Sequence, residues 1–119
     1  MVRTLWLALV FVLGTSTAAA SVWPSSHQRI ADALTHGDVS ERRGAAAKLT
    51  QLPPKLAREL SRQALRDNDI EVRLFAARAA AELGVSRAGD EVMEWLSDRD
   101  VRLRVAACEL IEASPTPQS

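Results

Sequence analysis

The sequence predicts an all-α protein, built as a solenoid of three helical hairpins. The main observation is an internal repeat of 31 residues, marked by an aspartate before Val or Ile at Asp38, Asp69 and Asp100. Alanine, leucine and arginine dominate from about residue 27 onward, and these residue types favour helix. Aromatic residues make up 4% of the chain and glycines number five, which argues against a β-sandwich or barrel.

Four further sets of residues recur at fixed distances from these aspartates. A leucine stands four residues before each aspartate, an arginine four after it, small residues seven and eight after it, and a small or apolar residue eleven after it. In chain order they are Leu34, Leu65 and Leu96; Arg42, Arg73 and Arg104; Ala45-Ala46, Ala76-Ala77 and Ala107-Cys108; and Leu49, Ala80 and Ile111. Such agreement over three copies in a short chain indicates a true structural repeat.

Each repeated position has a physical role in a pair of helices. The aspartate is a typical N-cap, because its side chain accepts hydrogen bonds from the free N–H groups of the first turn. The small and apolar residues after it share one helical face and allow a neighbouring helix to approach. The three leucines before the aspartates are expected to form one apolar spine through the stack. Predicted helices span residues 26–36, 39–52, 55–66, 70–83, 88–97 and 101–113, in units of about 26–52, 55–83 and 88–113.

The pattern resembles the short HEAT-like repeats first named for phycobilin lyases, which show Asp, then Val-Arg, then Ala-Ala at about this period. The similarity covers about residues 26–113, and the segment IEVRLFAA at 70–77 matches best; the first copy departs at Glu41 and Gly44. The resemblance implies a right-handed α-solenoid in which each unit contacts only its neighbours. It also implies that the repeated aspartates and arginines bond between adjacent units, as structural rather than catalytic groups.

Residues 1–20 are predicted to be a secretory signal peptide. Arg3 gives a positive start, residues 5–13 (LWLALVFVL) form an apolar run, and Ala18-Ala19-Ala20 supplies small residues before a cut at Ser21. The run is shorter than the roughly 20 residues of a membrane span. We therefore expect a bacterial periplasmic or secreted protein using the Sec route, with a HEAT-like domain at 21–113 and a flexible tail at 114–119. Membrane attachment is expected only if the leader stays uncleaved.

The residue types that carry catalysis form no recognisable site in the sequence. His27 and His36 are nine residues apart, about 180° around the predicted helix, which is the wrong geometry for a shared metal. Cys108 occupies a position that holds alanine in the other copies, so we expect it to be buried. The 15 basic and 15 acidic residues give zero formal net charge, which argues against nucleic-acid binding. We predict no enzyme, no cofactor and no metal.

The remaining function is binding of a protein or peptide on a preformed surface. The second helix of each unit is expected to line the inner face, where charges of both signs suit a protein partner. Trp95 replaces the Ala33 and Ala64 of the other copies, so it either covers the open end of the stack or belongs to a docking patch. The candidate partner-binding residues are Glu71, Arg78, Glu82, Trp95, Arg102 and Glu109.

Three other possibilities stay open at this point. The uncovered C-terminal end predicts pairing with a second copy or with another protein. The family resemblance alone raises an accessory subunit or lyase of the chromophore-attaching type. An uncleaved leader would make the protein a membrane-tethered spacer.

Overall fold

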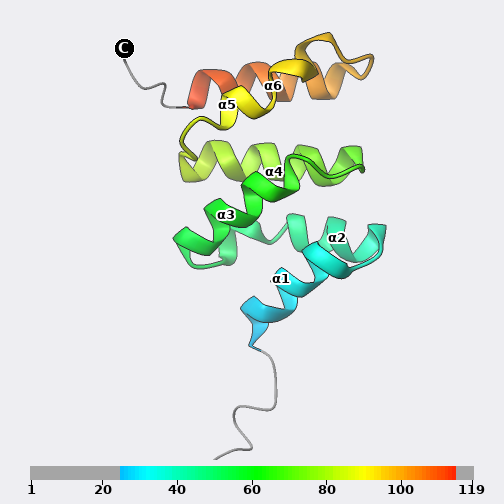
Figure 1. The fold of residues 1–119 in the computed structure, drawn as a ribbon, viewed down its shortest axis with the longest axis vertical. Coiled ribbons are helices and arrows are strands. Elements are labelled where there is room, and N and C mark those ends of the chain that lie inside the picture. The colour runs from blue at the N-terminus through cyan, green and yellow to red at the C-terminus, as the bar shows by residue number, and fades with distance from the viewer. Residues whose placement is uncertain (1–24, 115–119) are drawn as a thin grey trace, which may run out of the picture.

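The computed structural model describes residues 25–114, and every regular element in that range is helical (Figure 1). The predicted signal peptide and residues 115–119 of the predicted tail lie outside the described residues. The elements are α1 (Ser26–His36), α2 (Val39–Ala46), η2 (Leu49–Gln51), α3 (Pro54–Ala64), α4 (Ile70–Leu83), α5 (Ala88–Glu91), η3 (Met93–Ser97) and α6 (Val101–Ala113), where η denotes a 3₁₀ helix.

The helices form three pairs that stack along the long axis of the molecule (Figure 1). α1 packs on α2, α3 packs on α4, and α5 with η3 packs on α6. Successive pairs are joined mainly by contacts of α4 with α2 and with α6. The predicted all-α solenoid is therefore confirmed. None of the helices within residues 25–114 combines the length and apolar character needed to cross a membrane.

The repeated aspartates cap the second helix of each pair, as the sequence predicts. The backbone N–H of Glu41 donates to Asp38 at 2.8 Å, that of Val72 donates to Asp69 at 3.1 Å, and that of Arg102 donates to Asp100 at 2.9 Å. Each bond satisfies one of the N–H groups that a helix start leaves free. The caps therefore fix where α2, α4 and α6 begin in all three pairs.

Three predicted helices, at 26–36, 70–83 and 101–113, match the observed bounds, and the one predicted at 55–66 is observed at 54–64. The helix predicted at 39–52 is shorter, because α2 ends at Ala46 and only the 3₁₀ turn η2 follows. Gly44 weakens the helix at this point, since glycine loses more backbone freedom than other residues on folding. Leu52 must then be extended, with ψ 158°, because Pro53 follows it.

The helix predicted at 88–97 is divided into α5 and the 3₁₀ helix η3, and this changes which residues face the core. In a 3₁₀ helix a residue lies on the same face as the residue three positions earlier. Val92 and Trp95 therefore both point inward and are 0% and 2% exposed. Leu96, one position further, is turned about 120° from Val92 and is 39% exposed.

The predicted leucine spine is consequently correct for two pairs and wrong for the third. Leu34 and Leu65 are buried, with 3% and 2% of their surface exposed, but Leu96 faces solvent. At the roughly 100° per residue of an α-helix, Leu96 would lie near the face of Val92, as Leu65 lies near that of Ser61 in α3. Trp95 takes over the core position in the third pair.

The repeated Asp and Arg residues bond between adjacent units only in part. Arg42 donates through Nε to Asp67 of the next pair at 3.0 Å, and Asp69 accepts from Arg43 of the preceding pair at 2.7 Å. Asp38 and Asp100 bond within their own units. The remaining arginines also differ: Arg104 donates to the carbonyls of Asp98 and Arg99, and Arg73 lies over the ring of Trp95.

Cys108 is exposed, so the prediction that it is buried is wrong. Ala46 and Ala77, at the same repeat position, are 2% and 3% exposed because the next helical pair lies against them. α6 is the last helix of the described residues, and nothing in residues 25–114 lies against this side of it. Cys108 therefore occupies the same repeat position as these alanines, and it is exposed because no helix within residues 25–114 packs on it.

Candidate functional site

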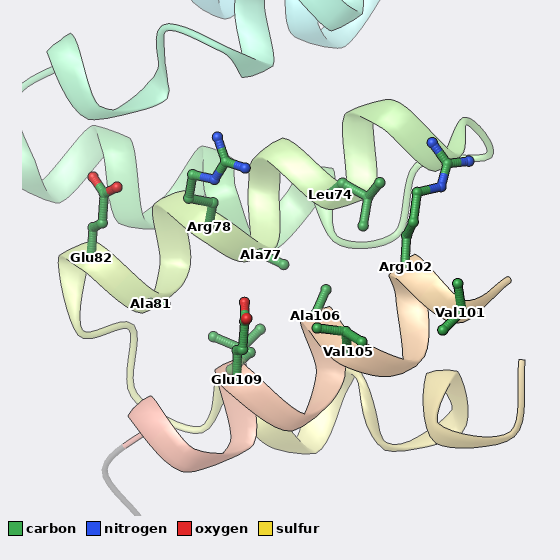
Figure 2. Close-up of a pocket in the computed structure, with 11 residues that line it drawn as sticks. Leu74, Ala77, Arg78, Ala81, Glu82, Val101, Arg102, Val105, Ala106 and Glu109 are labelled. Atoms are coloured by element: carbon green, nitrogen blue, oxygen red, sulfur yellow. The ribbon is translucent and has the colours of Figure 1, made fainter.

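An open groove runs between α4 and α6, with a volume of about 470 Å³ (Figure 2). Both walls come from the second helices of neighbouring pairs, so the groove is part of the stacking surface. Its apolar residues are Leu74, Ala77, Ala81, Val101, Val105, Ala106 and Leu110, and its charged residues are Arg78, Glu82, Arg102 and Glu109.

Small residues keep the groove open. Ala77 and Ala81 of α4 and Ala106 of α6 contribute only a methyl group each, so the side chains do not fill the space between the helix axes. Val101 and Val105 border this space and are 55% and 51% exposed. Exposed apolar side chains beside a hollow are the surface that a partner could cover with a gain in free energy.

Arg102 closes the groove where α4 and α6 begin. Its guanidinium donates to Glu71 of α4 at 2.7 Å and to Asp100 at 2.8 Å. The hydrogen bond to Asp100, followed by that to Glu71, raises the pKa of Arg102 above its ordinary value, and the same contact with Arg102 lowers the pKa of Asp100. The charge of Arg102 is thus already compensated, and its role is to tie the first turns of the two helices together.

Arg78, Glu82 and Glu109 are exposed, and among the described residues they have no ion-pair partner within 4.0 Å. In Figure 2 the Glu109 side chain points from α6 toward α4, whereas Arg78 and Glu82 project from α4 away from α6. These three charges can therefore form new pairs with a bound partner without breaking an existing one.

The structure brings together most of the residues that the sequence indicates for partner binding. Arg78, Glu82, Arg102 and Glu109 line the groove, and Glu71 is joined to Arg102 at its end. The apolar residues of the groove were not predicted. Leu74 and Val105 occupy the same repeat position in successive copies, which could have indicated an apolar strip, but the first copy has Arg43 there.

Trp95 does not belong to this surface. It is 2% exposed, and Arg73 covers its ring with the guanidinium carbon 5.6 Å from the ring centroid. Because the 3₁₀ winding of η3 turns it inward, its indole fills the core between α4 and α6 instead of meeting a partner. The docking role considered for Trp95 is therefore wrong.

The histidines are apart from the groove. His27 and His36, at the two ends of α1, are both exposed. Within residues 25–114 there is no group of three or more His, Cys, Asp or Glu side chains that could hold a metal ion. The groove is instead defined by apolar contacts and by charges on its edge.

Stacked helical pairs with an open groove between their second helices define a helical-repeat protein with a binding surface. The family model of HEAT repeats matches residues 28–112, which is most of the chain, and the protein therefore belongs to the HEAT repeat family. HEAT repeats generally act as protein-interaction or scaffold modules. Comparisons with curated proteins and with solved structures find no significant match.

Proposed function

We propose that the protein is an interaction module that holds a segment of another protein or peptide in the groove between α4 and α6. The observation that carries this proposal is the groove itself, where half-exposed valines lie beside small residues and uncompensated charges. The walls are two helices already packed in the free protein, so little conformational entropy is lost on binding. Burial of Val101 and Val105 would supply apolar contact, and Arg78, Glu82 and Glu109 would select the partner's charges.

The proposal is for binding without catalysis, cofactor or nucleic acid. Support comes from the use of the repeated Asp residues in helix caps and of several Arg residues in ion pairs, which are structural roles. The charges of the groove are of both signs, which suits a protein partner more than a phosphate backbone.

Export to the periplasm or the medium is part of the same proposal. Its support is the order of charged, apolar and small residues in 1–20, which lie outside the described part of the structure. N-terminal sequencing of the protein recovered from the cell envelope tests it. A mature start at Ser21 supports export with cleavage, whereas a start at Met1 supports a membrane-tethered form.

A charge exchange on the edge of the groove tests the binding site. The double variant Arg78→Glu/Glu82→Lys keeps the net charge and the exposed positions of α4 but reverses the pattern that a partner meets. The matched control, Lys48→Glu/Glu59→Lys, makes the same kind of exchange at exposed residues away from the groove.

The measurement is quantitative capture from the native envelope fraction on each immobilised protein. We expect proteins that the wild type and the control retain equally to be reduced at least about tenfold on the groove variant. Equal retention by all three would show that the groove is not the binding site.

Self-pairing through the C-terminal end is the remaining part of the proposal. The described residues include five exposed large apolar side chains, and four of them belong to the last helical pair. These four are Met93, Leu96, Val101 and Val105. Solenoid proteins need polar surfaces on their terminal repeats to stay soluble as monomers. An apolar terminal surface therefore favours association with another chain.

A further inference from the structure

One side of α6, beginning at the edge of the groove, carries a line of exposed residues at helical spacing. Val101, Val105, Cys108 and Glu112 stand at positions i, i+4, i+7 and i+11, so they share a face. All four are exposed, with Val101 at 55% and Val105 at 51%. We call these four residues the outer face of α6.

The matching face of α4 shows what such a surface does in this fold. Leu74 and Ala77 of α4 correspond to Val105 and Cys108 of α6, one repeat later. In α4 this face packs toward α6, and Ala77 is only 3% exposed. The outer face of α6 is therefore the surface by which a helical pair receives the next helix, but without a helix on it among the described residues.

The charges on this side of α6 are arranged symmetrically about Cys108. Arg104 stands four residues before it and Glu112 four residues after it. Arg104 uses only Nη1 for the carbonyls of Asp98 and Arg99, so its Nη2 and Nε make no hydrogen bond with the described residues. Glu112 is exposed and has no ion pair with them.

We infer that a second copy of this chain covers the outer face of α6, with the two α6 helices antiparallel about a two-fold axis at Cys108. In this register Arg104 of each copy lies opposite Glu112 of the other. Cys108 faces its own counterpart. A parallel arrangement in register would place arginine against arginine and glutamate against glutamate, which the charge pattern disfavours.

This inference rests on the self-pairing that the proposed function includes, and it adds the contact residues and their orientation. Val101 and Val105 belong to both surfaces, because they line the groove and also stand on the outer face of α6. A second copy on this face and a partner in the groove would therefore share these two side chains.

Charge reversal tests the register. Sedimentation equilibrium of the purified, reduced protein is expected to show a dimer. Glu112→Arg places two arginines together at both ends of the contact and should raise the dissociation constant at least about tenfold. The double variant Arg104→Glu/Glu112→Arg restores the opposite charges and should return the constant to within about threefold of wild type. The control Glu59→Arg changes an exposed glutamate of α3 and should leave it unchanged.

Thiol cross-linking gives a second, independent readout. A short bismaleimide reagent should join two reduced wild-type chains at Cys108 and should not join the Cys108→Ser variant. As a matched control, Cys108→Ser/Ala47→Cys moves the thiol to an exposed residue after α2, where no cross-linked dimer is expected.

The possible failures separate cleanly. A monomer in sedimentation with no cross-linked product would overturn both this inference and self-pairing, while the groove remains testable by its own variants. A dimer that is insensitive to Glu112→Arg and is not joined at Cys108 would overturn the register alone. Coverage of the outer face by a different protein would appear as a purified monomer whose Cys108 becomes protected only in a mixed complex, and would also overturn the inference.

Discussion

The guanidinium carbon of Arg73 lies 5.6 Å from the centroid of the Trp95 ring, between the second and third helical pairs. At the junction before it, the corresponding arginine, Arg42, instead pairs with Asp67 at 3.0 Å. One repeated residue thus joins its neighbour by an ion pair in one place and by a cation–π contact on a buried ring in the other. The change from an ion pair to a cation–π contact follows from Trp95, because its large ring stands where the other copies have alanine.

Replacement of Trp95 by alanine should therefore remove more than a surface contact. Trp95→Ala leaves a cavity beneath Arg73 and should lower the free energy of unfolding by about 3–5 kcal/mol. Met93→Ala, in the same helix but 53% exposed, is the control and should cost less than about 1 kcal/mol. Urea unfolding followed by circular dichroism measures both. Equal losses in the two variants would contradict the core role of Trp95.

The repeat in the sequence predicts the fold because each helical pair has the same local signals. The aspartate caps set the starts of α2, α4 and α6, and Gly84, with φ +61°, ends α4 in the left-handed conformation typical of a helix C-terminus. The winding of η3 has no such signal. The residues of η3 align with the end of α3 in the repeat but form a 3₁₀ helix. As a result Trp95 points into the core, where Leu96 is expected from the repeat.

The candidate site could be predicted only for its charged residues. Periodicity places Arg78 and Glu109 at equivalent exposed positions of α4 and α6, but the space between the helices depends on their separation. Leu74 and Val105 line that space and share one repeat position. The first copy has Arg43 at this position, so the repeat does not indicate an apolar strip there. Cys108 illustrates the second limit, because a repeat shows which side faces the next unit but not whether another unit covers it.

The corrected spine makes a direct prediction for two leucines at the same repeat position. Leu65→Asp places a charge at a site that is 2% exposed and should lower the free energy of unfolding by more than about 3 kcal/mol. Leu96→Asp changes a side chain that is 39% exposed and should cost less than about 1 kcal/mol. Thermal melting followed by circular dichroism compares them. If Leu96→Asp lowered the free energy of unfolding as much as Leu65→Asp, the leucine spine that the sequence predicts would include Leu96 after all.

Replacement by alanine should change the free energy of unfolding in opposite directions at Gly44 and Gly84, although both positions have space for a methyl group. No heavy atom lies within 4 Å of the Cβ that either substitution would add. Gly44→Ala, inside α2, should raise the free energy of unfolding by about 0.5–1 kcal/mol, because alanine loses less backbone entropy in a helix. Gly84→Ala must hold φ +61° and should lower it by about 1–2 kcal/mol. Urea titrations measure both, and a shift of the same sign would contradict this account.

Asp69 gives the stability of the protein a defined dependence on pH. The hydrogen bond from Arg43 lowers the pKa of Asp69 from 3.8 to about 2. Burial opposes this shift, and the N–H groups of Val72 and Glu71 add to it.

A carboxyl group with a lowered pKa stabilises the fold above its ordinary pKa, and this contribution is lost as the pH falls through the folded value. Asp69→Asn should therefore be less stable than wild type at pH 6, with the difference shrinking below pH 4 and mostly lost near pH 2. The control Asp32→Asn, at an exposed residue of α1 with no ion pair within residues 25–114, should leave the wild-type profile unchanged. Unfolding free energies from urea titrations between pH 2 and pH 7 test this, and a constant difference for Asp69→Asn would mean that the carboxylate charge is not what Asp69 contributes.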